Sequence, residues 1–359
     1  ADVYIVNTCS VTNIADRKSR QMLHRAKKKN PQALVVAVGC YVQVASQELA
    51  ADPSVDILIG NNRKGQLADI LEEFGRSGGH TAWLEDIGKE QACEPLRLER
   101  RGEHTRAFIR VQDGCNQFCS YCIIPYARGR VRSRKPEDIL KEIRSLAADG
   151  VTEIMLLGQN VNSYGKTLPE PMTFAQILEE VEKIEGLERI RFMTSHPKDL
   201  SDELIEVMRD SRKICRHLHL PLQSGSSRIL KAMNRRYTKE QYLELAGKIR
   251  REIPDISLTT DIIVGFPGET EEDFLETMDV VEKVRYDSAF TFIYSKRTGT
   301  PAAKMEDQVP EEVVKDRFDR LLAQVQKISS EVSGRDVRTV QKVLAEEVNS
   351  HDSRLLTGR

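Results

Sequence analysis

Short apolar runs alternate with stretches of helical periodicity along the first part of the chain. Three of the runs, VYIVN, LVVAVG and VDILIG, are almost entirely apolar, and helical patterns over residues 14–29 and 46–51 separate them. Continuous β-branched runs joined by helical crossovers predict a parallel sheet that is covered on both faces. Cys9, Cys40 and Asn61 follow these runs. They are therefore predicted to meet at one edge of the sheet, where such folds bind ligands.

A second alternating series begins at residue 106 and contains six strand-like runs. They are AFIRV, EIMLLG, RIRFMT, RHLHLPL, SLTTDIIVGF and AFTFIYS. Helical patterns lie between or after them, over residues 136–148, 173–184, 201–209, 239–251, 271–284 and 311–331. A closed barrel of this type has eight strand–helix units. Six units therefore predict an open, partial barrel with its chemistry in the loops that follow the strands.

These patterns predict an α/β protein with three folded parts and a segment that joins the first two. Residues 1–95 form the parallel-sheet domain, residues 101–331 form the partial barrel, and residues 75–105 are predicted to be a linker or edge segment. Residues 332–359 change to a period-two pattern, which predicts the start of a small β module. The chain opens without Met inside one strand pattern and stops inside another, so we expect it to be part of a longer protein.

Composition and charge exclude several classes of protein. Of the 359 residues, 40% are hydrophobic and 30% are charged, which is the balance of a folded globular protein. The longest apolar run, residues 33–38, is too short to span a membrane, and no signal segment opens the chain. We therefore expect a cytoplasmic protein without membrane contact, and we expect a monomer. The net charge of −1 excludes a globally basic nucleic-acid-coating protein but allows local basic patches.

Three of the seven cysteines lie within eight residues of one another. Cys115, Cys119 and Cys122 form a C-x3-C-x2-C motif, which favours metal or cluster ligation over disulfides. Three thiolates can ligate three corners of a 4Fe–4S cluster and leave the fourth iron for a small molecule. A structural zinc site needs a fourth protein ligand, and the next histidine along the chain is His196. We therefore favour the open cluster over two alternatives, a zinc site and a four-cysteine electron carrier.

The segment DGCNQFCSYCIIPYARGRVRSR resembles the radical S-adenosylmethionine (SAM) superfamily. In that superfamily this spacing holds the cluster, SAM chelates the open iron, and an aromatic residue precedes the last cysteine, as Tyr121 does here. NTCSVT around Cys9 and VAVGCYVQ around Cys40 are similar to the N-terminal domain of its methylthiotransferases. That resemblance implies an auxiliary 4Fe–4S cluster on three cysteines, of which Cys9 and Cys40 match the second and third. The first would lie upstream of Ala1, so we expect this chain to hold the auxiliary cluster poorly.

Four further motifs, LLGQNVNSYG, RFMTSHP, HLPLQSGS and SLTTDIIVGFPGET, resemble the MiaB branch of this family, which acts on N6-isopentenyladenosine at position 37 of tRNA. The C-terminal segment is similar to the start of an RNA-binding TRAM module. The resemblance implies reductive cleavage of one SAM to a 5′-deoxyadenosyl radical that activates C2 of the adenine. It also implies that a second SAM supplies the methyl group to sulfur at the auxiliary cluster, and that a donor such as flavodoxin or ferredoxin supplies electrons.

Three alternatives to this function remain. A methylthiotransferase of the same family could act on threonylcarbamoyladenosine in tRNA or on a ribosomal protein. A protein of another class, an iron–sulfur protein that binds RNA or transfers electrons without SAM chemistry, would carry the same cysteine motif.

Polar residues after or within the barrel strands are the candidates for binding SAM. The resemblance places Gln159 and Asn160 near the methionine end of SAM. The full set of candidates comprises Tyr121, Gln159, Asn160, Ser195, Gln223 and Asp261.

One basic stripe is the main candidate for binding RNA phosphates. Its charges recur at every second position, as on one face of an extended segment, and phosphate binding by such a stripe is independent of sequence. The stripe consists of Arg128, Arg130, Arg132, Arg134 and Lys135, with Arg235–Arg236 and Lys296–Arg297 as secondary candidates. The target adenine is expected to stack on an aromatic residue such as Tyr126 or Tyr164.

Overall fold

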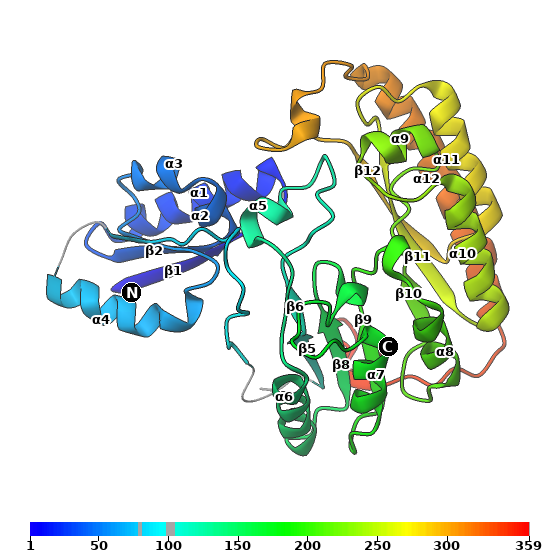
Figure 1. Ribbon diagram of the computed structural model, residues 1–359, viewed down its shortest axis with the longest axis horizontal. Coiled ribbons are helices and arrows are strands. Elements are labelled where there is room, and N and C mark those ends of the chain that lie inside the picture. The colour runs from blue at the N-terminus through cyan, green and yellow to red at the C-terminus, as the bar shows by residue number, and fades with distance from the viewer. Residues whose placement is uncertain (78–80, 98–104, 359) are drawn as a thin grey trace.

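The computed structural model of the protein describes residues 1–77, 81–97 and 105–358. Two bodies built on parallel sheets lie side by side, and an antiparallel hairpin follows at the C-terminus (Figure 1). The prediction of an α/β protein is confirmed. Within the described part of the chain, no helix combines the length and the apolar character needed to cross a bilayer.

The N-terminal body is a parallel sheet with the strand order β1-β2-β3-β4. Its strands are β1 (Val3–Thr8), β2 (Leu34–Gly39), β3 (Ile57–Ile59) and β4 (Thr81–Trp83), and its helices are α1 (Asn13–Lys29), α2 (Cys40–Val44), α3 (Ser46–Ala50) and α4 (Leu67–Ser77). Successive residues of a strand point to opposite faces. Val35 and Ala37 therefore pack with α1, whereas Val36 and Val38 pack with α4. Both faces are covered, as the continuous apolar runs predict.

The segment predicted to be a linker contains the fourth strand of this sheet. β4 pairs with β3, and Thr81 lies opposite Ile57 in the register. Because β4 is the edge strand of the sheet, the edge alternative holds for residues 81–83 and the linker alternative is wrong there, while residues 78–80 and 98–104 lie outside the described part. The three residues of β4 are too few to give a periodic signal. Their extended conformation depends on pairing with β3.

The second body is an open barrel of parallel strands. β5 (Arg106–Arg110), β8 (Glu153–Leu157) and β9 (Arg189–Phe192) form one sheet, and β10 (His217–His219), β11 (Ser257–Val264) and β12 (Ser288–Ile293) form another. A parallel bridge between Ile190 and Ile214 joins the two sheets. In the described structure β5 and β12 each pair on one side only. The barrel is therefore open, as six strand–helix units predict.

Helices cover the outer face of the barrel (Figure 1). They are α6 (Pro136–Ala148), α7 (Phe174–Glu182), α8 (Asp202–Asp210), α10 (Lys239–Glu252), α11 (Glu271–Val284) and α12 (Glu311–Ser333). The side chains of Thr173, Ser201, Thr238 and Thr270 cap the first turns of α7, α8, α10 and α11. These caps satisfy backbone N–H groups that have no partner within the helix, so they fix where the helices begin.

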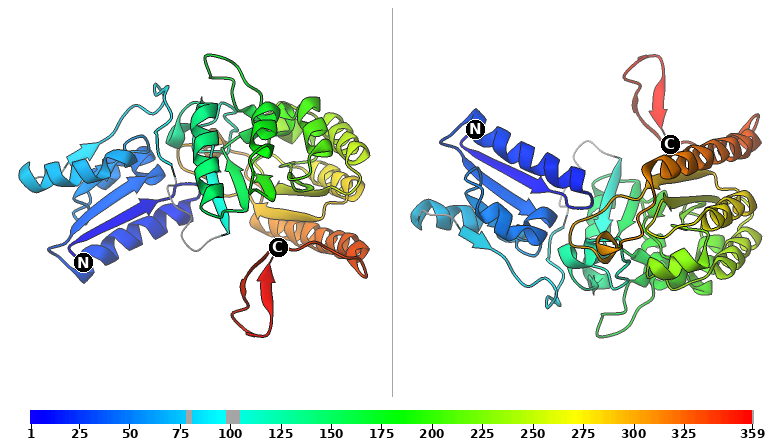
Figure 2. Two further views of the ribbon diagram at one scale, coloured as in Figure 1. Left: turned by 90° about the horizontal axis from the view of Figure 1, so that it is seen from below. Right: turned by 90° about the horizontal axis from the view of Figure 1, so that it is seen from above.

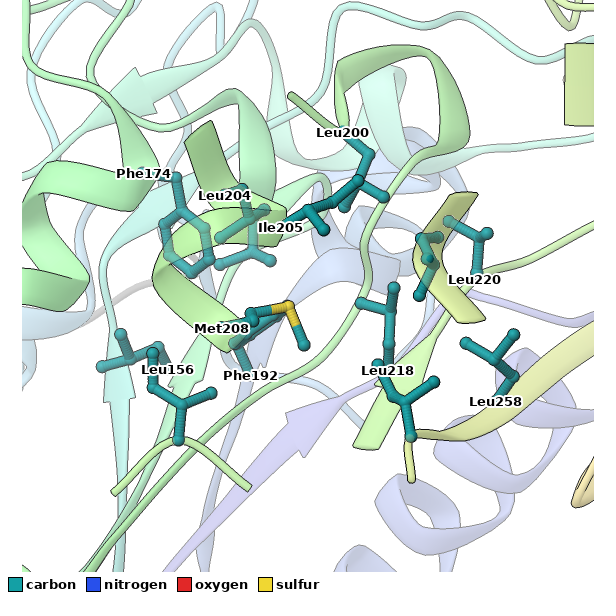
Figure 3. Packing of buried hydrophobic residues seen from close by; sticks show 14 of the residues in the cluster. Leu156, Phe174, Phe192, Leu200, Leu204, Ile205, Met208, Leu218, Leu220 and Leu258 are labelled. Carbon is teal, nitrogen blue, oxygen red and sulfur yellow. The ribbon is translucent and has the colours of Figure 1, made fainter. Parts of the chain in front are cut away.

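The main hydrophobic core lies between the strands and these helices. Figure 3 shows Leu156, Phe192, Leu218 and Leu258, which come from four barrel strands. They belong to one buried cluster with Met208 of α8. Each of the five side chains is at most 3% exposed. Burial of such a side chain contributes about 1.5–3 kcal/mol. This core therefore fixes the strands whose carboxyl ends carry the candidate polar residues.

The C-terminal segment forms an antiparallel hairpin of β13 (Ala345–Val348) and β14 (Leu356–Gly358). Figure 2 shows it projecting from the barrel beyond α12. A hydrogen bond of 3.0 Å from Thr105 Oγ1 to Glu346 Oε1 connects it to the start of β5. Only the end of the period-two pattern, residues 345–348, forms a strand of this hairpin, and residues 337–344 are not in a strand.

Candidate functional site

The three-cysteine loop lies between the first barrel strand and the first outer helix. Two short strands, β6 (Gln112–Asp113) and β7 (Arg132–Ser133), pair in antiparallel fashion at its base. Helix α5 (Ile124–Arg128) begins two residues after Cys122. The loop is therefore framed by secondary structure on both sides.

A glycine permits the loop to close. The backbone N–H of Cys115 donates to the carbonyl of Gly129 over 3.1 Å. Gly114, immediately before the first cysteine, has φ of +76°, and a Cβ atom built on it would lie 2.0 Å from the carbonyl oxygen of Arg130. Only glycine combines this backbone conformation with such a close approach.

The other side of the loop is held by the residues that follow α9 (Ser227–Ala232). The backbone N–H of Ser120 donates to the carbonyl of Met233 over 3.0 Å. The side-chain amide of Asn234 donates to the carbonyl of Phe118 over 2.9 Å. The loop is thus positioned by the barrel and not only by its own sequence.

The thiols of the loop are enclosed. Cys119 is 8% exposed, and Cys115 and Cys122 are partly buried. Burial raises the pKa of Cys115 to about 11 and that of Cys122 to about 12, although backbone N–H groups of Gln117 and Ile124 act in the opposite direction. Metal binding must therefore displace protons from these thiols. The N–H groups that face the sulfurs favour the resulting thiolates.

The donor set fits a cluster better than a single ion. Within the described residues, no three His, Cys, Asp or Glu side chains are arranged to hold one metal ion. A mononuclear zinc site needs its ligands around one centre. A 4Fe–4S cluster instead takes one thiolate at each of three separate irons. Three thiols from one loop without a further ligand match the second case.

A buried guanidinium lies against this loop. Arg235 is 8% exposed, and its Nη1 donates to the sulfur of Cys119 over 3.7 Å. Its Nε donates to the hydroxyl of Tyr237 over 3.0 Å, and its Nη2 donates to the carbonyl of Pro221 over 3.1 Å. No carboxylate of the described chain forms an ion pair with it. A buried charge is costly unless an opposite charge compensates it, and a thiolate-bound cluster is anionic. The position of Arg235 therefore fits such a cluster.

Three predicted SAM contacts carry buried polar atoms that have no hydrogen-bond partner among the residues that the structure describes. They are Gln159 Oε1 and Asn160 Oδ1, which follow β8, and Ser195 Oγ, which follows β9. Buried polar atoms are nearly always hydrogen-bonded, so each exception calls for an explanation. Their position at the carboxyl ends of barrel strands fits a polar ligand at that place.

Asp199 links these residues to the cysteine loop, and the sequence analysis missed it. Its Oδ2 accepts hydrogen bonds from Gln117 over 2.8 Å and from Asn160 over 2.7 Å. Its Oδ1 forms an ion pair with Lys166 over 2.8 Å. One carboxylate therefore holds a loop residue and a candidate SAM contact together. An isolated Asp after a strand gives no sequence signal for this role.

The remaining predicted SAM contacts lie in different places. Gln223 has φ of +67° and joins β11 through a backbone bridge to Ile262. Asp261 lies within β11 and not at its end, with its Oδ2 3.3 Å from Nε2 of His219. Tyr121 packs beside a buried apolar cluster that includes Phe266. Among the described residues, the partners of the Asp199 carboxylate are Gln117, Asn160 and Lys166, and neither Gln223 nor Asp261 is one of them.

Cys9 and Cys40 follow two directly paired strand ends. Thr8 of β1 lies opposite Gly39 of β2, and each cysteine is the next residue. Cys9 is exposed and Cys40 is buried. The amide nitrogen of Asn61 lies 3.4 Å from the sulfur of Cys40. The predicted convergence of the three residues at one edge of the sheet is therefore observed.

Helix α5 connects this edge to the three-cysteine loop. The side-chain amide of Asn61 also donates to the carbonyl of Ala127 over 2.7 Å. Helix α2, which begins with Cys40, packs against α5. A five-residue helix is about 8 Å long. The two cysteine groups thus lie at opposite ends of one short helix.

A second contact fixes the two bodies relative to each other. Arg297, in the loop after β12, donates to Ser10 Oγ over 2.7 Å and to Asn13 Oδ1 over 2.6 Å, and it forms an ion pair with Asp16 over 2.8 Å. Ser10 adjoins Cys9, so this arginine positions the Cys9 loop against the barrel. A cavity of about 720 Å³ lies beside the contact, with Tyr126 in its wall.

Comparison with known proteins identifies the family. Residues 109–281 match the Radical SAM superfamily, and residues 1–60 match a family described as "Uncharacterized protein family UPF0004". A tRNA-2-methylthio-N(6)-dimethylallyladenosine synthase of Lachnoclostridium phytofermentans is 53% identical over 100% of this chain and 80% of its own length. Proteins of the same name from Acetivibrio thermocellus and Carboxydothermus hydrogenoformans are 50% and 51% identical over 100% of this chain, and it covers 76% and 82% of them. The chain belongs to this family of synthases.

Solved structures of two other proteins share the fold of this chain. The radical SAM methyltransferase TsrM of Kitasatospora setae has a TM-score of 0.66 at 17% identity, over 84% of this chain and 64% of TsrM. The cobalamin-dependent radical SAM enzyme OxsB has a TM-score of 0.54 at 13% identity, over 92% of this chain and 48% of OxsB. These similarities confirm the fold predicted for the barrel.

The predicted RNA-binding stripe of this synthase is largely buried. Arg132 is 2% exposed and lies near Asp113, and Arg134 is 7% exposed and pairs with Glu142 over 2.7 Å. Arg128 is partly buried and pairs with Asp113 over 2.9 Å. The expectation of one exposed basic face is therefore wrong. Arg130 and Lys135 are the exposed members of the set.

Two secondary RNA candidates and one stacking candidate are also buried. Arg235 and Arg297 are 8% and 6% exposed and serve the contacts described above. Tyr164 is 2% exposed, and its hydroxyl donates to the carbonyl of Arg134 over 2.8 Å. Tyr126 is 44% exposed and lines the cavity between the bodies, so it is the member of the pair that a base can reach.

Proposed function

We propose that the protein transfers a methylthio group to C2 of N6-isopentenyladenosine at position 37 of tRNA. Relatives that are 50–53% identical over the whole chain carry a name for this activity. The structural observation that carries the proposal is the loop of three enclosed thiols beside Arg235, a buried cation without a carboxylate partner in the described chain. Together they provide a place for an anionic, soft-ligand cluster.

The protein uses SAM and iron–sulfur chemistry, as members of the radical SAM superfamily do. When bound, these groups supply a radical that can activate an aromatic C–H bond, which acid–base side chains cannot do. Cys115, Cys119 and Cys122 hold the cluster, and Arg235 balances its charge. Burial in the barrel keeps water away from this chemistry.

The polar residues around the loop orient SAM. Gln159, Asn160 and Ser195 offer unpartnered oxygens to its amino-acid end. Asp199 accepts hydrogen bonds from both Asn160 and Gln117 and so fixes Asn160 relative to the three-cysteine loop. Tyr121, Gln223 and Asp261 complete the proposed site from the loop and the later strands. These groups bind and position SAM, and no proton transfer by them is required.

The N-terminal body supplies the second cysteine group. Cys9 and Cys40 supply two of the three thiolates that hold the auxiliary cluster, and the side-chain amide of Asn61 donates toward the sulfur of Cys40. Because α5 is short, a group carried at the auxiliary cluster would lie near the SAM site.

The proposed division of labour follows the parts of the chain. Residues 1–95 carry the auxiliary cluster, residues 101–331 carry the SAM chemistry, and residues 332–359 begin a TRAM module that contacts tRNA. Among the stripe residues, Arg130 and Lys135 are accessible to phosphates. The enzyme works as a monomer and receives electrons from a flavodoxin or a ferredoxin.

Nucleoside analysis tests the substrate. The gene is expressed in a bacterial strain that lacks its own enzyme, and tRNA nucleosides are measured by mass spectrometry. We expect methylthio-isopentenyladenosine to appear, and we expect Cys119→Ala to abolish it. A methylthio group on threonylcarbamoyladenosine or on a ribosomal protein, with isopentenyladenosine unchanged, would assign the protein to another branch.

A further inference from the structure

The outer face of α1 carries a dense and unpaired positive charge. This helix contains seven Lys and Arg residues and one acid, in a chain whose net charge is −1. Leu23 and Ala26 of α1 are buried, and its solvent-facing side bears five exposed cations. These are Arg17, Lys18, Arg25, Lys28 and Lys29.

The remaining cations of α1 have partners on its flanks. Arg20 pairs with Glu48 over 3.2 Å, and Lys27 pairs with Asp56 over 2.8 Å. By contrast, none of the five outward cations forms an ion pair with any residue that the structure describes. The acid of the helix, Asp16, is buried and bound to Arg297. Nothing on the outward face of the helix neutralises its charge.

Helix stability alone does not account for this charge. Lys28 and Lys29 lie in the last turn, where the helix dipole favours cations. Arg17, Lys18 and Arg25 lie outside the last turn, so the dipole does not stabilise them. Their charge is therefore available to a ligand outside the helix.

The helix leads away from the cavity between the two bodies. Figure 2 shows α1 along the outer edge of the N-terminal sheet, with one end at the barrel. Asn13, at that end, contacts Arg297 and lines the cavity that contains Tyr126. From Arg17 to Lys29 the helix spans about 18 Å. A stretch of RNA that follows the cations toward the barrel therefore reaches the exposed ring of Tyr126 in the wall of the cavity.

We propose that the outward face of α1 binds the sugar–phosphate backbone of the RNA substrate and directs one nucleotide into this cavity. The inference rests on the proposed function for the identity of the RNA. Phosphate contacts by Lys and Arg supply affinity without reading sequence, and stacking on an aromatic residue suits an unpaired base. The exposed ring of Tyr126 and the five cations provide both elements.

A charge-neutralised variant tests the proposal. The variant Arg17→Gln/Lys18→Gln/Arg25→Gln/Lys28→Gln/Lys29→Gln is compared with the unchanged chain for binding an anticodon stem–loop RNA that carries isopentenyladenosine, at several KCl concentrations. We expect Kd to rise at least about tenfold near 0.1 M KCl. We expect the slope of log Kd against log [KCl] to fall by about 2–4, since each lost phosphate contact removes about 0.7–0.9.

A matched control removes the same number of charges from the outer helices of the barrel. The control variant replaces Lys141, Arg144, Arg251, Lys315 and Lys327 by Gln, all exposed and without an ion pair among the described residues. It should keep the affinity and the salt slope of the unchanged chain. Circular dichroism and thermal melting establish that both variants fold, and the smaller variant Arg17→Gln/Lys18→Gln should lower the slope by about 1–2.

Several outcomes would overturn the proposal. One is an α1 variant that binds the RNA with unchanged Kd and salt slope. Another is a variant that keeps RNA binding but loses binding to vesicles containing anionic phosphatidylglycerol, or to an acidic flavodoxin. Failure of the proposed function has a different signature, in which the unchanged chain binds the RNA and cleaves SAM without forming a methylthio product.

Discussion

The two cysteine groups of this protein are built in opposite ways. Cys115, Cys119 and Cys122 come from one loop, and burial and the N–H groups around the loop shape their environment. Cys9 and Cys40 come from the ends of two strands and share a site only because β1 and β2 pair in one register. The first group is a property of local sequence, whereas the second is a property of the sheet. Damage to either should therefore have a different signature.

The largest expected effect separates the two groups by chemistry. Replacement of Cys115, Cys119 or Cys122 by Ala should lower 5′-deoxyadenosine formation by the reconstituted, reduced protein to background, because the cluster loses one of three ligands. Cys40→Ala should keep most of this formation and lose methylthio transfer. Chromatography of both products measures the contrast. Equal loss of both products in Cys40→Ala would show that the groups do not act separately.

The next effect concerns the contact that positions the Cys9 loop. Arg297→Ala leaves the buried Asp16 without its partner, which costs about 3–5 kcal/mol when a buried pair is broken. Methylthio transfer should fall at least about tenfold while 5′-deoxyadenosine formation continues, with part of the transfer restored in Arg297→Lys.

The control for this variant is Lys304→Ala, an exposed residue of the same region. Denaturant unfolding gives the stability of each variant, and the ratio of the two products gives the coupling between the sites. If 5′-deoxyadenosine and the methylthio product declined equally in Arg297→Ala, the role of this arginine would be purely structural.

A smaller effect should appear in the reduction potential of the SAM-binding cluster. Arg235→Gln removes a positive charge beside Cys119, and reduction adds a negative charge to the cluster. One charge about 6 Å away contributes about 2–3 kcal/mol at an effective dielectric constant of 20, and about 59 mV corresponds to a tenfold change for one electron. We therefore expect a shift of about 90–130 mV toward negative potential.

Redox titration followed by electron paramagnetic resonance measures this potential. Arg235→Lys should recover part of the shift, because it retains the charge. Arg236→Gln, which removes the adjacent exposed charge, should leave the potential unchanged. Equal shifts in Arg235→Gln and Arg236→Gln would contradict a specific role of the buried guanidinium.

The smallest effect concerns α9, whose C-terminal end holds the three-cysteine loop through Ser120. Asp273 accepts a hydrogen bond from Ser226, the N-cap of α9, over 2.6 Å and pairs with Arg228. Burial alone would raise the pKa of Asp273, but hydrogen bonds from Arg228 and Ser226 lower it to about 2. Because this pKa lies below the unfolded value near 4, the carboxylate stabilises the fold above pH 4.

That stabilisation should disappear as the pH falls from about 4 to 2, by at most about 2 kcal/mol. Urea unfolding of the cluster-free chain between pH 5 and pH 2 measures it. Asp273→Asn should lack this pH-dependent part while retaining the acid sensitivity of the rest of the chain. An identical acid profile in the variant would exclude Asp273 as the source.

The sequence predicted features that depend on local pattern. Six apolar runs gave the barrel, and the spacing of Cys115, Cys119 and Cys122 gave the cluster loop. The convergence of Cys9, Cys40 and Asn61 followed from the rule that parallel strands share one carboxyl edge. Ser195 was proposed by the same rule, whereas Gln159 and Asn160 were proposed from the family resemblance, and the contact of all three with SAM stays a prediction.

The sequence could not separate arginines that bind from arginines that brace the fold. Arg132 and Arg134 alternate as an exposed stripe would, but β7 turns them inward toward Asp113 and Glu142. Arg235 and Arg297 owe their roles to partners that are more than 100 positions away. The exposed cations of α1 lie on the polar face of an amphipathic helix, and such a pattern alone does not distinguish a binding face from a solvated one. Which charges remain unpaired is decided only by tertiary contacts.

Gly114 has a consequence for how this protein can evolve. Even the methyl group of alanine would collide with the carbonyl of Arg130. No other amino acid is therefore expected to be tolerated at the position before the first cysteine. Natural variants should keep glycine at this position while the surrounding charged residues vary. A variant without this glycine would need a different backbone conformation at the start of the three-cysteine loop.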